Sequence, residues 1–213
     1  MNYELRIKGQ TNQQLNSSTI KQLKKQLYIT LIVTAALASC KEGYTPKPRA
    51  FFRIDLPEKA YVLFDDRVSP YTYEIPVYAE VVPYETEGEK FWANINFPSL
   101  NATINMSYKS LRQAALRDLV ADAMTFVDKH QGKAMRIREL AFDDQTNRVF
   151  GMLFDIGGVG VASTYQFYLT DSNRHFVRGA LYFEGAPNND SLAPVVEFLK
   201  FDMDRLIETF TWR

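Results

Sequence analysis

Cysteine and histidine are scarce in this sequence. Among its 213 residues there are one cysteine, Cys40, and two histidines, His130 and His175. A single cysteine excludes an intrachain disulfide, and so few thiols and imidazoles supply a closed zinc site poorly. We therefore expect no metal, and no motif in the chain indicates a cofactor.

An excess of one charge sign is also lacking, because 25 basic and 25 acidic residues cancel. Their distribution is uneven: residues 1–39 hold five bases and one acid, which leaves 20 basic and 24 acidic residues in the rest of the chain. This mildly acidic remainder argues against the basic surface that binds nucleic acid. We expect no nucleic-acid partner.

Glycine and proline are few, at 10 and 9 residues, while 46% of the residues are hydrophobic and 23% are charged. This composition is typical of a globular chain and not of a disordered or fibrous one, with a single domain as the default. The apolar run Leu27–Ala38 is too short for the roughly 20 residues of a lasting transmembrane helix.

The start of the chain has the pattern of a targeting signal. Three lysines, Lys21, Lys24 and Lys25, precede the apolar run Leu27–Ala38. A positive segment followed by a short apolar segment and small residues is typical of a signal peptide. We interpret residues 1–39 as an N-terminal extension and a lipoprotein signal peptide.

The cysteine explains why this signal is assigned to a lipoprotein. Cys40 follows Leu37, Ala38 and Ser39, an apolar residue and two small ones, and this resembles the bacterial lipobox. In a lipobox the cysteine sulfur takes a diacylglyceryl group, and two or three acyl chains, such as palmitate, anchor strongly because each buried methylene contributes roughly 0.8 kcal/mol. The alternatives are a plain secretory signal with an incidental cysteine, or an uncleaved core helix.

A tether and one globular domain are expected after the anchor. Pro46 and Pro48 lie among basic residues, a composition that favours extended polyproline II at ~3.1 Å per residue. We therefore predict a lipidated cysteine and tether over residues 40–50, and a single α+β domain over residues 51–213.

Alternating or continuous apolar patterns predict the strands of this domain. They cover residues 71–81, 91–98, 101–109, 134–142, 147–156, 161–170 and 175–184. Pro76 interrupts the first strand and suggests an edge or a bulge. Short turn-rich segments join the last four strands, as in an antiparallel meander. Residues 147–156 and 175–184 are apolar on both faces and are predicted to be central strands.

Helical periodicity predicts two helices. The first begins at Ser110 as N-cap and ends before Gly132, and the second begins near Asp190 or Ser191 and runs to Phe210. The order of elements predicts an antiparallel sheet of about six to seven strands with two main helices packed on it. Such an α/β/α sandwich is similar in outline to PsbP-like domains, which is an analogy of architecture only.

Two motifs contain the residue types of a phosphate-binding loop or of a catalytic site. Gly157, Gly158 and Gly160 are followed by a strand, whereas a phosphate-binding loop opens into a helix, so we predict a turn. A second motif supplies the residue types of a hydrolase triad and consists of Asp171, Ser172 and His175. These three crowd one turn, whereas a triad converges from separate elements.

A mismatch in the strand over residues 175–184 indicates a candidate interaction surface. Alternation places Arg178 on the same face as apolar neighbours, so it either pairs with a carboxylate inside the domain or meets a partner that supplies the acceptor. Asp171 and Arg174 are expected to add exposed charge in the adjoining turn. The predicted surface consists of Asp171, Ser172, Arg174, His175 and Arg178.

Two long stretches carry a family resemblance. They are YTPKPRAFFRIDLPEKAY (Tyr44–Tyr61) and TDSNRHFVRGALYFEGAPNNDSLAPV (Thr170–Val195). With the lipobox, they resemble the gliding motility-associated lipoprotein GldD of the Bacteroidetes, over nearly the whole chain after Cys40. One departure is Ala50, where a glycine is expected.

The resemblance implies a cell-envelope lipoprotein needed for gliding, in bacteria whose gliding adhesins are exported by type IX secretion. It brings no catalytic residue and no cofactor. We expect a non-enzymatic accessory or structural component with a periplasmic domain, in contact with other gliding and secretion proteins. Two alternatives are an envelope hydrolase acting on peptidoglycan through the Asp171 motif, and a glycan or small-molecule-binding module that uses Trp92 and neighbouring tyrosines.

Overall fold

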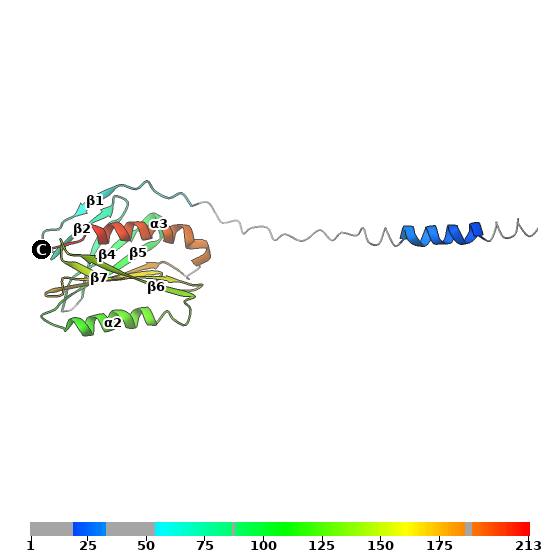
Figure 1. Ribbon diagram of the computed structural model, residues 1–213. Helices are drawn as coiled ribbons and strands as arrows, with labels where there is room; N and C mark the ends of the chain where they lie inside the picture. The colour runs from blue at the N-terminus through cyan, green and yellow to red at the C-terminus, as the bar shows by residue number, and fades with distance from the viewer. Residues whose placement is uncertain (1–18, 33–53, 87, 186–188) are drawn as a thin grey trace, which may run out of the picture. The chain divides into compact units, whose positions relative to one another are not determined.

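The computed structural model describes residues 19–32, 54–86, 88–185 and 189–213. The chain divides into two units, Met1–Ala50 and Phe51–Arg213. In the first unit, residues 19–32 form a helix (Figure 1). Within the described ranges, the helices are too short or too polar to cross a membrane. The lipobox Leu37, Ala38, Ser39 and Cys40 and the tether lie outside the described residues.

A seven-stranded antiparallel sheet forms the centre of the second unit, in the order β3-β4-β5-β9-β8-β7-β6. Its strands are β3 (Glu80–Thr86), β4 (Glu89–Phe97), β5 (Ala102–Ser110), β6 (Arg136–Asp144), β7 (Val149–Gly157), β8 (Tyr165–Thr170) and β9 (His175–Phe183). A second sheet, in the order β1-β2-β10, consists of β1 (Tyr61–Phe64), β2 (Tyr71–Pro76) and β10 (Thr211–Trp212). The helical elements described in this unit are η1 (Pro98–Leu100), α2 (Leu116–Asp128) and α3 (Asn189–Glu208).

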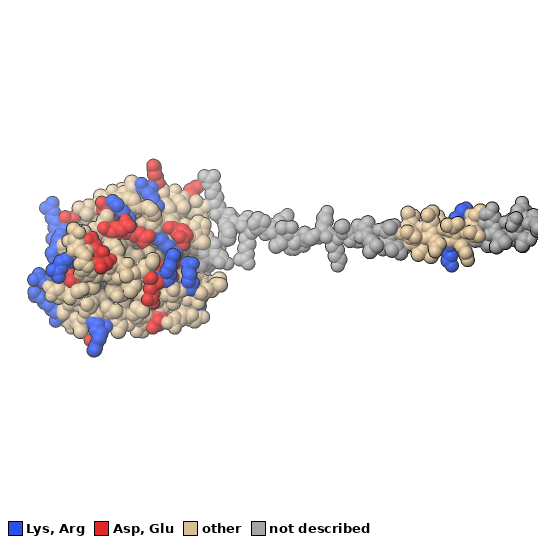
Figure 2. Space-filling model, in the orientation of Figure 1, with Lys and Arg blue, Asp and Glu red and all other residues tan. Residues whose placement is uncertain are grey.

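The two helices lie on opposite faces of the large sheet (Figure 1). The main core includes apolar residues of α3, such as Leu199 and Met203, together with Phe167 of β8 and Val177 of β9. Two smaller clusters lie on the α2 side, where Val127 packs with residues of β7 and Leu119 packs with Phe176. The predicted α/β/α sandwich is therefore confirmed, with most of its apolar burial on the α3 side. Figure 2 shows basic and acidic side chains mixed over the visible face of this unit.

Most predicted elements are present. The hairpin of β4 and β5 forms, and β6 to β9 are a meander in which each strand pairs with the next. The strands that are apolar on both faces, β7 and β9, are both interior, and β9 is the middle strand of the sheet.

Three predicted boundaries are wrong. The strand over residues 71–81 is two strands, because β2 ends at Pro76, which has no N–H to donate, and β3 joins the other sheet. The first helix begins at Leu116, because Ser110 pairs with His175 and extends β5. The second helix ends at Glu208, and Phe210 lies beyond it. The short strands β1 and β10 were not predicted.

One buried carboxylate joins β1 and the segment after β2 to the last helix. Asp202 of α3 accepts hydrogen bonds from the Nζ of Lys59 at 2.6 Å, the hydroxyl of Tyr61 at 2.7 Å and the hydroxyl of Tyr78 at 2.6 Å. Burial and these bonds raise the pKa of both phenols. Residues before and after β2 are thereby held on α3.

Candidate functional site: a groove between α2 and the sheet

The seven-stranded sheet is wider than α2, the helix that covers the face opposite α3. An α-helix with its side chains is about 10 Å across and covers about two strands spaced ~4.8 Å apart. α2 contacts β8 and β9. The same face of β3, β4 and β5 is left beside the helix, and a cavity of about 580 Å³ lies there. A cavity of this size suits a small ligand.

The cavity is lined by both layers. The sheet contributes Tyr84 from β3, Trp92 and Asn94 from β4, and Asn105, Ser107 and Lys109 from β5. The other side consists of Phe176 and Arg178 from β9 with Leu119, Asp122, Ala123 and Phe126 from α2. Aromatic rings, amides and charges of both signs therefore meet in one groove, which we call the α2 groove.

A β-bulge aims Trp92 into the α2 groove. Tyr84 pairs with Trp92 and Thr86 with Glu89, so β4 carries one extra residue between these pairs. Phe91, in this insertion, has φ of +62°, which is rare for an aromatic residue. Its carbonyl oxygen accepts a hydrogen bond from the Tyr71 hydroxyl at 2.7 Å. Bulges occur often beside functional sites, where they re-aim a side chain.

The indole of Trp92 is held on two sides. Its Nε1 donates to the carbonyl oxygen of Tyr108 at 3.0 Å, and its ring stacks with that of Tyr84 at a centroid distance of 6.4 Å. Trp92 was a candidate ligand-binding residue of the sequence, and the structure places it in the groove wall with one neighbouring tyrosine.

Arg178 lies across the groove among neutral partners. Its guanidinium stacks 3.9 Å from the ring centroid of Phe126, and Nη2 donates to Oε1 of Gln166 at 2.9 Å. Burial lowers the pKa of Arg178, and Tyr182 partly opposes this effect. Among the described residues, no carboxylate forms an ion pair with Arg178. The expected internal carboxylate partner is therefore not found there, because an amide and an aromatic ring from α2 take that place.

Further polar groups of the lining lie on β4 and β5. Nδ2 of Asn105 donates to Oδ1 of Asn94 at 2.8 Å. Lys109 forms an ion pair with Glu89. The two amides line the cavity from interior strands, and at Asn94 and Asn105 the backbone is paired with a strand on each side.

The expectation that Asp171 adds exposed charge is wrong. Asp171 is 9% exposed, and its Oδ1 accepts the backbone N–H groups of Asn173 at 3.0 Å, Arg174 at 2.7 Å and His175 at 2.8 Å. Burial alone would raise the pKa of Asp171, but these hydrogen bonds lower it below its ordinary value. The carboxylate therefore holds the turn between β8 and β9.

His175 faces away from the groove. Its Nδ1 bonds the Tyr108 hydroxyl at 2.8 Å, and its ring stacks on Trp212 at 5.2 Å. Burial lowers the pKa of His175. Because side chains alternate along a strand, His175 and Arg178 lie on opposite faces of β9.

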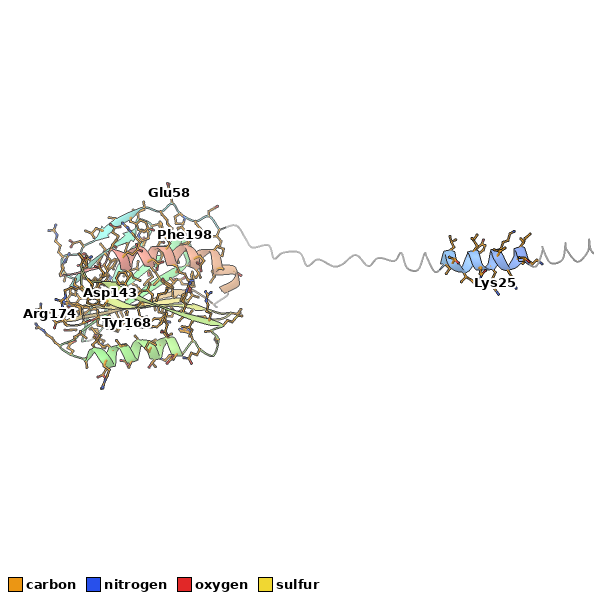
Figure 3. All side chains as sticks on the ribbon, viewed as in Figure 1. Lys25, Glu58, Asp143, Tyr168, Arg174 and Phe198 are labelled. Carbon is orange, nitrogen blue, oxygen red and sulfur yellow. The ribbon has the colours of Figure 1, made fainter. Side chains whose placement is uncertain are left out.

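The five residues of the predicted interaction surface are therefore separated. Arg174 projects from the end of the domain. It lies away from the layer between the sheet and α2, in which Tyr168 is found (Figure 3). Ser172 and Arg174 are exposed, Asp171 caps the turn, and Arg178 lines the groove. Gly157 is the last residue of β7, and Gly158 and Gly160 lie between β7 and β8, so a strand follows the three glycines as predicted.

These features define an α/β/α sandwich domain with a ligand-sized groove on one face of its sheet. The family model of the gliding motility lipoprotein GldD matches residues 41–212. The chain therefore belongs to the GldD family of gliding motility lipoproteins, which are anchored to a membrane of the cell envelope. This confirms the resemblance seen in the sequence.

Other comparisons are more distant. No curated protein matches the sequence. Among solved structures, the solution structure of cyanobacterial PsbP (CyanoP) from Synechocystis sp. PCC 6803 is similar, with a TM-score of 0.45 and 11% sequence identity. The alignment covers 79% of this chain and 100% of that chain.

Proposed function

We propose that this lipoprotein is a non-enzymatic accessory or structural component of the gliding and type IX secretion apparatus, and that it acts through protein contacts. The family match over residues 41–212 carries this proposal. The engagement of Asp171 with backbone N–H groups and of His175 with Tyr108 and Trp212 also supports it, because both side chains have structural partners. Other gliding and secretion proteins of the envelope are the proposed partners, with the domain in the periplasm.

The proposal includes the route to the envelope. Residues 1–39 serve as a signal peptide, and the sulfur of Cys40 takes the diacylglyceryl group, with palmitate among its acyl chains. The family match begins at residue 41, directly after this cysteine, which is consistent with Cys40 as the first residue of the mature lipoprotein.

The test compares wild-type cells with cells that carry Cys40→Ala. Because Cys40 is the acceptor of the lipid, the variant is expected to lose labelling by radioactive palmitate and to accumulate as an uncleaved precursor. Crosslinking in cells is expected to capture gliding and secretion proteins with the wild type and to lose them with the variant. Fractionation of the two membranes locates the anchor.

Ser39→Ala is the matched control, since alanine keeps a small residue before Cys40 and labelling should persist. Normal labelling of Cys40→Ala would refute the lipoprotein assignment of this cysteine. Crosslinks to envelope proteins unrelated to gliding or secretion would refute the proposed partners.

A further inference from the structure

The α2 groove has an unusual combination of a rigid aromatic ring and a half-buried cation. We propose that it binds an acidic sugar chain, with a sugar ring stacked on Trp92 and a sugar carboxylate paired with Arg178. This site is additional to the protein contacts proposed above and does not depend on them.

The surroundings of Arg178 favour an acid group in the ligand. Within the described ranges, its side-chain partners are the Gln166 amide, the Phe126 ring and the Tyr182 phenol, all of them neutral. Gln166 is 1% exposed, and its Nε2 has no hydrogen-bond partner in the described structure. The Arg178 guanidinium in the cavity wall therefore meets neutral groups, and a carboxylate can accept two parallel hydrogen bonds from a guanidinium.

The other cation of the groove is already neutralised. Lys109 pairs with Glu89, which leaves Arg178 as the cation of the described lining that lacks a carboxylate. Asp122 of α2 also lines the cavity, but no ion pair joins it to Arg178 among the described residues. An acidic ligand would therefore complete a charge pair that the domain leaves open.

The surroundings of Trp92 favour a sugar ring next to that acid. The bulge at Phe91, the Nε1 hydrogen bond and the stacked Tyr84 hold the indole, so stacking on it costs little side-chain entropy. Trp92 lies on β4 and Arg178 on β9, with β5 between them. Two strand spacings place their backbones about 10 Å apart, which one sugar ring with its carboxylate can bridge between the two side chains.

The floor of the groove favours a sugar over a peptide. β4 and β5 pair with each other over Ala93–Phe97 and Ala102–Met106, and β3 and β9 pair with their outer sides, so a peptide cannot add a strand to this part of the floor. The side chains of Asn94, Asn105 and Ser107 present amide and hydroxyl groups instead. Such groups both donate to and accept from sugar hydroxyls.

The experiment is titration calorimetry on the full-length lipoprotein, in a detergent without a sugar head group. The probes are trigalacturonate, its neutral methyl ester and tetraglutamate. Trigalacturonate is expected to bind at least ~10-fold more tightly than either of the others, because only it combines sugar rings with carboxylates. Undetectable binding of trigalacturonate, equal binding of its ester, or tighter binding of tetraglutamate would each overturn the proposal.

Variants localise the site. Trp92→Ala and Arg178→Gln are expected to weaken trigalacturonate binding at least ~10-fold, while Arg174→Gln, which removes the same charge from the exposed turn, leaves it unchanged. Since either groove variant could impair folding, Asn105→Asp adds a negative charge at an exposed position and should weaken binding of trigalacturonate but not of a neutral sugar. Unaltered affinity in Asn105→Asp would place any binding elsewhere. Crosslinking in cells tests the protein contacts separately, so the two proposals can fail independently.

Discussion

At the scale of single residues, position in the fold decides what a reactive side chain does. Asp171 and His175 are adjacent to the same turn, yet the carboxylate accepts backbone N–H groups and the imidazole bonds Tyr108. A hydrolase triad needs the carboxylate to orient the imidazole toward a nucleophile. In this turn both groups stabilise the junction of β8, β9 and β5.

His175→Gln is therefore expected to preserve gliding. Glutamine keeps a hydrogen-bonding side chain beside Tyr108 and loses only the ring stacked on Trp212. Gliding speed, measured together with the amount of accumulated protein, checks this prediction. His130→Gln, a change of the same kind at a site after α2, is the control. A His175→Gln variant that accumulates normally but does not glide would favour the hydrolase alternative.

The sequence pattern around Arg178 predicted the strand face on which it lies but not the residues that it contacts. Alternation along β9 correctly indicated a charged residue on an apolar face. The partners of Arg178 outside its own strand are Phe126 on α2 and Gln166 on β8. Neither partner could be identified from the neighbours of Arg178 in the sequence, because each arrives through the packing of another element.

At the scale of elements, close approach of neighbouring strands sets strict limits on side-chain size. A Cβ at Gly151 of β7 would lie 1.9 Å from the backbone oxygen of Tyr168 on β8. Backbone atoms cannot move aside as the end of a flexible side chain can, so the strand pair itself would have to shift.

Gly151→Ala is thus expected to lower the free energy of unfolding by about 2 kcal/mol. Thermal unfolding measures the change, and for a chain of this size the midpoint should fall by about 5 °C. Gly132→Ala is the matched control, because nothing lies within 4 Å of its added Cβ and its φ is not positive. Equal midpoints for the two variants would contradict the predicted clash.

Element boundaries differ from those predicted where a residue pairs with another that is far away in the sequence. Ser110 is a good N-cap by residue type, but pairing with His175 keeps it in β5. Leu111 then donates its N–H to the carbonyl oxygen of Arg174 at 2.8 Å. β10 is only two residues long and exists because β2 pairs with it, so no local periodicity could reveal it.

At the scale of the whole molecule, buried carboxylates make stability depend on pH. Asp155 accepts hydrogen bonds from Lys200 and Arg138, each at 2.7 Å. Burial alone would raise its pKa, but these two cations lower it below the ordinary value. Hydrogen bonds from backbone N–H groups likewise lower the pKa of Asp171 below its ordinary value.

A carboxyl group whose pKa is lower in the folded state stabilises the fold above its unfolded pKa and loses this contribution as the pH falls through the folded value. We expect the free energy of unfolding, measured in urea, to fall as the pH drops below about 4. Asp204 acts in the opposite direction, because burial raises its pKa and its contribution is lost as the pH rises. Asp171→Asn should reduce the loss of stability in acid; an unchanged acid slope would contradict this role for Asp171.

The class of the fold and the family can be recognised from the amino-acid sequence alone. Periods of two and 3.6 residues, turn-rich segments and the long stretches shared with GldD proteins are all read within short windows of the chain, so they are visible without coordinates. They predicted the meander, the central strands and the two helices, and they identified Trp92 and Arg178 as residues to explain.

The place where Trp92 and Arg178 line one cavity depends on how the elements pack. The α2 groove exists because one helix covers part of a wide sheet, because β5 pairs with β9, and because a bulge at Phe91 turns Trp92 toward the cavity. Each of these depends on strand register and on contacts between segments far apart in the chain. A shift of register by one residue would send every side chain of a strand to the other face, so the site follows from packing and has no signature in any local stretch.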